Sequence, residues 1–263
     1  MSKSFFDNRV AQKLRNKEKV SAAWLTLDSN LTAEIIAECG YDMAVVDMEH
    51  AQVSLQDLIS MIQAMKGTDC APFVRAPWND IVWCKQILDA GAYGIHVPYV
   101  STREEAEKAV KYCKYAPEGL RGIAGNHRGV NFGMNKGDYF DRANRDVVVI
   151  AAIETIQGVN NIEEIVQVEG LDGIFIGPLD LSSSMGHLGH PEDEEVQKAI
   201  ERIEEVVLKS DKFLGTTTPD MRSAQKLYEK GYTVVYGTSD VYAVVQTAKK
   251  EMEYYKTYID PGK

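Results

Sequence analysis

Eight short apolar runs, rich in Val and Ile, recur along the chain and alternate with longer amphipathic segments. Runs of this length that are each followed by a helical pattern are typical of buried parallel strands joined by helical crossovers. The runs cover residues 20–27, 43–48, 72–75, 93–100, 147–154, 173–178, 213–217 and 233–236. The pattern predicts an α/β fold, a (β/α)₈ TIM barrel forming a single domain over residues 1–263.

A doubly wound open sheet is the alternative arrangement for eight such units. Open sheets that bind nucleotides usually carry a glycine-rich turn after their first strand. Here the first run leads into TLDSNLTAE, which contains no G-x-G-x-x-G motif. The closed barrel is therefore the favoured interpretation.

Several residues predict where helices begin and end. Asn30 is expected to cap the first crossover helix and Gly40 to end it. Ser101 and Glu104 fit a capping box, and Pro191 fits the first turn of a later helix. The stretch 115–146 is a long connection rich in Gly and Asn, which is usually functional or interfacial in a compact barrel.

The charge balance narrows the range of partners. With 29 basic and 39 acidic residues the net charge is −10, which disfavours nucleic acid as the main partner. No apolar run approaches the roughly 18–20 residues that span a bilayer, and the start MSKSFFDNRV lacks a signal sequence, so we expect a cytoplasmic protein with no membrane partner. The four cysteines form no C-x-x-C pair, which indicates reduced thiols and disfavours zinc held by sulfur.

Polar side chains follow several of the predicted strands, where barrel enzymes place their catalytic groups. They are Asp47, Glu49 and His50 after the second run, Arg75 after the third, Glu154 after the fifth and Asp180 after the sixth. Lys residues are lacking at these positions, which argues against a Schiff-base aldolase.

Glu154 and Asp180 occupy corresponding places on neighbouring strands. Two adjacent carboxylates repel each other unless a cation or proton lies between them, and oxygen-only ligation suits Mg²⁺, Mn²⁺ or Co²⁺. In the alternative, one carboxylate forms a salt bridge with Arg75 and the other caps a helix.

The histidines allow several interpretations. His50 is a candidate general base, or a polar loop residue. His187 and His190 flank a turn, MGHLGHPE, which fits a helical metal site poorly, and His96 fits the barrel interior. Arg75 lies within an apolar strand and needs an anionic partner from the protein or the substrate.

Several of these motifs together resemble the HpcH/HpaI aldolase family, metal-dependent aldolases related to the citrate lyase β-subunit barrel. The resemblance runs from about residue 20 to about residue 245. Its motifs are VDMEHA (46–51), VRAPWND (74–80), LDAGAYGIHVP (88–98), EGLRG (118–122), AAIET (151–155) and VEGLDGIFIGPLDLSSSMGHLGHPEDEEV (168–196).

The resemblance implies a role for each matching residue. Glu154 and Asp180 match the metal ligands, His50 the catalytic histidine, Asp47 the residue that orients it, and Arg75 the arginine that stabilises enolate charge. Gly177 and Pro178 match the turn beside the substrate carboxylate, and Asp89 matches a position near the neighbouring subunit's site. Such enzymes act on small-molecule 2-oxo acids and aldehydes, as hexamers (trimers of dimers) that exchange a C-terminal helix.

The chain departs from this family at two places. Ala152 stands where many members carry a Gln that contacts the bound oxo acid, which questions pyruvate as the donor. The segment GIAGNHRGVNFG places His127 and Arg128 near the expected mouth of the site. A CoA-ester lyase and a catalytically impaired binding or assembly barrel remain as alternatives.

The C-terminal segment repeats apolar residues at helical spacing. They are Val241, Val244, Val245, Ala248, Met252 and Tyr255. This face fits packing on the barrel, or a subunit contact, since the nearby tyrosines are of a residue type favoured at interfaces.

Overall fold

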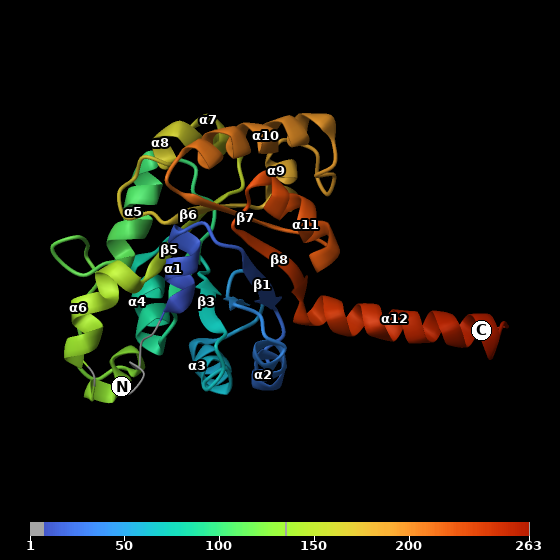
Figure 1. The fold of residues 1–263 in the computed structure, drawn as a ribbon, viewed down its shortest axis with the longest axis horizontal. Helices are drawn as coiled ribbons and strands as arrows, with labels where there is room; N and C mark the ends of the chain where they lie inside the picture. The colour runs from blue at the N-terminus through green and yellow to red at the C-terminus, as the bar shows by residue number, and fades with distance from the viewer. Residues whose placement is uncertain (1–7, 135, 263) are drawn as a thin grey trace.

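The computed structural model describes residues 8–134 and 136–262, and it confirms the closed parallel barrel. Neighbouring strands pair in sequence order, and β8 closes the barrel against β1 (Figure 1). The strands are β1 (Val20–Leu25), β2 (Met43–Asp47), β3 (Ala71–Arg75), β4 (Gly94–Val97), β5 (Val148–Ile153), β6 (Gly173–Ile176), β7 (Phe213–Thr217) and β8 (Val234–Ser239). The sequence also predicts an N-terminal extension ahead of the first apolar run, and part of it lies outside the described residues.

Helices connect the strands and surround the barrel (Figure 1). They are α2 (Asn30–Glu38), α3 (Leu55–Ala64), α4 (Ile81–Ala90), α5 (Arg103–Cys113), α7 (Ile156–Asn160), α8 (Ile162–Ile165), α9 (Pro178–Ser184), α10 (Glu194–Lys209) and α11 (Met221–Lys230). No helix among the described residues is long and apolar enough to cross a membrane.

Three predicted helix starts were wrong by one or a few residues. Ser29, not Asn30, caps α2, while Gly40 follows that helix with a positive φ of 86°, as expected. Thr102 with Glu105, not Ser101 with Glu104, forms the capping box of α5. Pro191 precedes α10, whose N-cap is Asp193. The first two errors arise because the neighbouring residue is an equally good cap in sequence terms.

The connection 115–146 also differs from the predicted loop. It contains a 3₁₀ segment, η1 (Arg128–Gly133), and a helix, α6 (Lys136–Asp146). The helix buries Tyr139 and Ala143 among otherwise polar residues, a weak apolar stripe that the Gly- and Asn-rich composition conceals.

The barrel interior is filled by layers of side chains from alternate strands. The strand registers place Trp24, Arg75, Ala152 and Thr217 in one layer, with Val45, His96, Phe175 and Tyr236 in the layer beneath. His96 is fully buried and its Nε2 atom shares a hydrogen bond with the Tyr236 hydroxyl, as expected for an interior residue. The short helix α1 (Arg9–Arg15) adds Val10 and Leu14 to this inner cluster.

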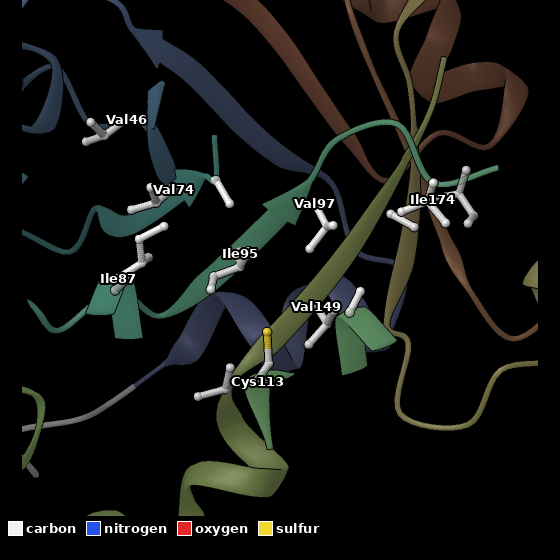
Figure 2. Packing of buried hydrophobic residues seen from close by; sticks show 14 of the residues in the cluster. Val46, Val74, Ile87, Ile95, Val97, Cys113, Val149 and Ile174 are labelled. Carbon is white, nitrogen blue, oxygen red and sulfur yellow. The ribbon is translucent and has the colours of Figure 1, made fainter. Parts of the chain in front are cut away.

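A second apolar layer lies between the strands and the surrounding helices. Figure 2 shows part of it, with Val46, Val74, Ile95, Val97, Val149 and Ile174 on the strands and Ile87 and Cys113 on the helices. All four cysteines are free thiols, and three of them are buried. Because apolar packing holds both faces of the strands, their carboxyl ends form a fixed platform for polar groups.

The last helix, α12 (Asp240–Tyr258), projects away from the barrel (Figure 1). Asp240 is its only buried residue, and Val244 is 58% exposed. The predicted alternative of packing on the chain's own barrel was therefore wrong. The apolar spacing in this helix provides a face that a single chain leaves uncovered.

Candidate active site

Arg75 ends β3, and its guanidinium lies between two carboxylates that follow or end β2. Nε and Nη2 donate to Asp47 Oδ1 and Oδ2 at 2.9 and 2.6 Å, and Nη1 lies 3.1 Å from Glu49 Oε2. The guanidinium carbon lies 4.7 Å from the ring centre of Trp24. Burial alone would lower the pKa of Arg75, but Asp47 and Glu49 raise it, so the guanidinium stays charged and fixed.

Glu154 directly follows β5 and is buried beneath the mouth of the barrel. Its Oε2 atom accepts a hydrogen bond of 2.8 Å from the backbone N–H of Tyr99, while its buried Oε1 atom has no hydrogen-bond partner. A Cβ atom at Gly177 would lie 2.7 Å from this Oε1, so glycine is needed there to accommodate the carboxylate. Glu154 therefore keeps one oxygen available for a ligand.

Asp180 lies in the first turn of α9, directly after β6. Its Oδ1 atom accepts a hydrogen bond of 3.3 Å from the Tyr99 hydroxyl. Tyr99 thus contacts the carboxylates of both Glu154 and Asp180, which places these two side chains at the same end of the barrel.

Negative charge exceeds positive charge in this group of side chains. Burial raises the pKa of Glu154 to about 7, and the charges of Glu49 and Asp180 act in the same direction. Burial likewise raises the pKa of Glu49 to about 7, with Arg75 lowering it and Asp47 and Asp180 raising it further. Arg75 alone does not balance these carboxylates, so the site favours an added cation or bound protons.

Glu154 and Asp180 fit a divalent metal ion. The unpartnered Oε1 atom of Glu154 is the kind of buried acceptor that a cation would satisfy, and carboxylate oxygens are the donors that Mg²⁺ and Mn²⁺ prefer. The alternative in which Arg75 pairs with one of them was wrong, because Arg75 instead pairs with Asp47 and Glu49. Within residues 8–134 and 136–262, no three His, Cys, Asp or Glu side chains form a ready metal cage.

The sequence profile of the family described as HpcH/HpaI aldolase/citrate lyase matches residues 21–247. The chain belongs to the HpcH/HpaI aldolase/citrate lyase family. This match confirms the resemblance that the motifs indicated. As a member of this family, the chain is a metal-dependent class II aldolase, which is a carbon–carbon lyase.

Relatives of known structure or name match almost the whole chain. A protein of Escherichia coli O139:H28 (strain E24377A / ETEC) named 5-keto-4-deoxy-D-glucarate aldolase is 38% identical over 241 residues, 92% of this chain and 94% of that protein. The structure of a family member from Burkholderia cenocepacia J2315 is 33% identical with a TM-score of 0.91, covering 95% of this chain and 100% of that one. An HpcH/HpaI aldolase from Desulfitobacterium hafniense DCB-2 is 27% identical with a TM-score of 0.86, covering 93% and 95%.

His50 lies at the rim of this candidate site. Its side chain is 57% exposed, and its Nε2 atom lies 3.8 Å from Glu49 Oε2. Asp47, expected to orient the imidazole, binds Arg75 and accepts hydrogen bonds from the backbone N–H groups of Glu49 and His50. Asp47 therefore fixes the backbone of His50, while the exposed ring faces solvent.

Asp89, His127 and Arg128 lie at the opposite end of the barrel. Asp89 is near the end of α4, where it binds Arg121 at 2.7 Å and lies 3.5 Å from His127 Nε2. Arg128 donates to the carbonyl of Ala90 at 2.8 Å. The expectation that His127 and Arg128 lie near the mouth was wrong, because α4 runs antiparallel to the strands and ends beside their amino ends.

The remaining predicted positions fall into two groups. Ala152 is buried in the layer of Arg75, and Pro178 begins α9 beside Gly177. Among the residues that the structure describes, His187 and His190 pair with carboxylates of the turn before α10 and of that helix's first turn, as a solvent-facing turn would.

Two residues of the site were given no role from the sequence. Glu49 stands inside VDMEHA, and only its ion pair with Arg75 and its raised pKa distinguish it from a surface acid. Tyr99 follows β4 in VPYV, a pattern without any polar spacing that could have revealed it. Its contacts depend on a backbone conformation that composition does not predict.

Proposed function

We propose that this aldolase cleaves or forms 4-hydroxy-2-oxo acids, with Glu154 and Asp180 holding Mg²⁺, Mn²⁺ or Co²⁺. The observation that carries the proposal is the buried Glu154 carboxylate, which has an unpartnered oxygen and a raised pKa and shares a neighbour with Asp180. A bound divalent ion would act there as a Lewis acid on the oxygens of a 2-oxo acid.

Arg75 supplies fixed positive charge to this reaction. Because Asp47 and Glu49 hold its guanidinium from two sides, it needs no reorganisation when negative charge develops on the donor fragment. Gly177 and Pro178 place the backbone of the turn beside Glu154, where the substrate carboxylate would bind.

His50 is proposed as the general base that takes the proton from the C4 hydroxyl. Its exposed imidazole is accessible at the rim of the site, and its backbone is fixed by Asp47. The substitution His50→Ala should lower turnover by about 10²-fold or more while divalent-ion affinity stays unchanged. Steady-state rates and Mn²⁺ titration measure the two effects. Loss of Mn²⁺ binding in this variant would instead make His50 a ligand.

The substrate class follows from the donor set and from the relatives. The Escherichia coli relatives are named 5-keto-4-deoxy-D-glucarate aldolase, so we propose an oxidised deoxy sugar acid as substrate, with a polar aldehyde as second fragment. Ala152 places a methyl group, not an amide, within the layer of Arg75, so the donor, pyruvate or a related 2-oxo acid, binds without an amide contact at this position.

One assay tests the reaction directly. Release of a 2-oxo acid from 4-hydroxy-2-oxo acids is measured with the metal-free protein, with Mg²⁺ and with Mn²⁺. We expect turnover that depends on the ion and stops with a chelator. Cleavage of a CoA ester instead, or ion binding without any cleavage, would replace the proposal by one of the two alternatives.

We also propose a cytoplasmic homo-oligomer, a hexamer formed as a trimer of dimers through exchange of α12. The exposed apolar residues of this helix support the assembly, and the four free thiols suit a reducing compartment. Sedimentation of the full chain against a chain ending at residue 239 would test the contribution of the helix.

A further inference from the structure

Tyr99 directly follows Pro98 beyond β4 and contacts both proposed metal ligands. We propose that Tyr99 is a positioning residue that orients Glu154 and Asp180 for cation binding. This inference rests on the proposed function, because it concerns the cation site named there. It assigns the role to one residue through two separate contacts, one from the backbone and one from the side chain.

The backbone contact depends on an unusual conformation. Tyr99 has a φ of 53°, in the left-handed region that residues with a Cβ atom rarely adopt. The preceding Pro98 has no N–H, so the N–H of Tyr99 is the first donor beyond this strand. It binds Glu154 Oε2 at 2.8 Å and leaves Oε1, packed against Gly177, as the oxygen free for a cation.

The side-chain contact reaches the second ligand. The Tyr99 hydroxyl donates to Asp180 Oδ1 at 3.3 Å, and this leaves the other carboxylate oxygen for a ligand. The Trp78 ring lies 5.9 Å from the Tyr99 ring at 32°, so it supports the phenol from one side. Because Glu154 follows β5 while Tyr99 and Asp180 follow β4 and β6, the phenol bridges across the intervening strand.

Partners that hydrogen-bond to metal ligands fix the direction in which the ligands point, and losing them weakens ion binding. Strained backbone also persists mainly where surrounding contacts require it. Tyr99 fits both generalisations. Its strained φ directs the N–H toward the carboxylate of Glu154, and its hydroxyl donates to the carboxylate of Asp180. The expected consequence is measurable in ion affinity without substrate.

The first test removes the hydroxyl alone. Mn²⁺ is titrated into the full-length, metal-free wild type and Tyr99→Phe by isothermal calorimetry, with free Mn²⁺ followed by electron paramagnetic resonance. We expect affinity to fall about 3- to 10-fold, at the lower end of effects for such partners because the hydrogen bond is long. Tyr228→Phe, which removes a hydroxyl that donates to the carbonyl of Val20 at the amino end of the barrel, serves as control and should match the wild type. Equal affinity in Tyr99→Phe and wild type would overturn the side-chain role.

The second test separates the backbone from the ring. Tyr99→Gly and Tyr99→Ala both remove the phenol, but only glycine adopts a φ near 53° without strain. We therefore expect Tyr99→Gly to bind Mn²⁺ several-fold more tightly than Tyr99→Ala and to melt at an equal or higher temperature. Equal or tighter binding by the alanine variant would overturn the backbone role.

The wild-type titration distinguishes this inference from the proposed function. If the wild type binds no Mn²⁺, the cation site itself is wrong and the role of Tyr99 falls with it. If the wild type binds Mn²⁺ and loses it in Asp180→Ala, while the Tyr99 variants bind normally, only the inference about Tyr99 is wrong.

Discussion

The two ends of the barrel are built on the same strands, yet two of their carboxylates, Asp42 and Glu154, are held in opposite ways. At the amino end, Asp42 accepts hydrogen bonds from Lys13 and Ser21, and Asn8 donates to the carbonyls of Tyr93 and Asp146. At the carboxyl end, the carboxylate of Glu154 is buried with one oxygen unpartnered. Asp42 and Asn8 are therefore paired within the chain, whereas Glu154 leaves capacity for a ligand.

The shifts in pKa follow the same division. Burial alone would raise the pKa of Asp42, but the bonds from Lys13 and Ser21 lower it below its usual value. Burial raises the pKa of Glu154 to about 7, because no fixed cation compensates for it fully. The difference teaches that a carboxylate paired within the chain, such as Asp42, serves stability, whereas an unpaired one, such as Glu154, keeps electrostatic strain at the proposed catalytic end.

Removing a carboxylate at the carboxyl end should produce the largest effect. We expect Glu154→Ala and Asp180→Ala each to lower ion-dependent turnover by about 10³-fold or more, since each removes one of two proposed ligands. Glu154→Gln, which keeps the size of the side chain, should not lower the melting temperature of the metal-free protein, because the buried charge that it removes is unfavourable there. Turnover, Mn²⁺ titration and thermal melts measure this. Chelator-resistant activity in either variant would contradict the assignment.

The matched change at the amino end should affect stability instead. Lys114 is buried, and its Nζ atom donates to the carbonyls of Asn144 and Val147 at 2.6 and 2.8 Å. Lys114→Met keeps an unbranched apolar side chain but removes the ammonium group and leaves both carbonyls without this donor, which should cost about 2–4 kcal/mol of unfolding free energy. Urea denaturation measures the loss, and turnover per folded molecule should stay constant. Reduced turnover at full stability would mean that the two ends are coupled.

The comparison also shows how much the sequence alone could predict. The apolar runs predicted the barrel and its strand order, because a strand that is buried on both faces is a continuous run of apolar residues. Glu154 and Asp180 could be selected because each follows a strand, and parallel strands end together. The error over His127 and Arg128 arose because the sequence does not show at which end a long connection packs.

Other parts of the site depend on three-dimensional geometry. The pairing of Arg75 with Asp47 and Glu49, rather than with Glu154, follows from strand register. The role proposed for Tyr99 depends on a backbone torsion that VPYV does not reveal. Such contacts join residues that are distant in sequence, so no periodic pattern records them.

The pH dependence of stability should have a different sign at the two ends. Between about pH 4.5 and 7, folded Glu154 holds a proton that the unfolded chain has released, so this group makes the metal-free protein less stable as pH rises. Glu154→Gln has no carboxyl group to ionise, so it does not lose this stability as pH rises. The free energy of unfolding of the variant should exceed that of the wild type by about 2–3 kcal/mol at pH 8. Chelator-treated proteins are unfolded in urea from pH 5 to 8. An advantage that is constant across this range would contradict the raised pKa.

The smallest effect is expected at Asp42, where the sign reverses. Its lowered pKa means that the folded carboxylate stays charged where the unfolded one is protonated, so its contribution is complete above about pH 4 and is lost as pH falls further. Asp42→Asn should cost less than about 1 kcal/mol at neutral pH, because Lys13 is partly exposed to solvent. The stability difference between Asp42→Asn and the wild type should shrink only as pH falls below about 4, whereas that of Glu154→Gln should shrink between about pH 7 and 4.5. The stability differences of Asp42→Asn and Glu154→Gln could instead vanish over the same pH range. Burial, and not pairing with Lys13, would then determine the pKa of Asp42 as it does that of Glu154, and the two ends of the barrel would not differ in this respect.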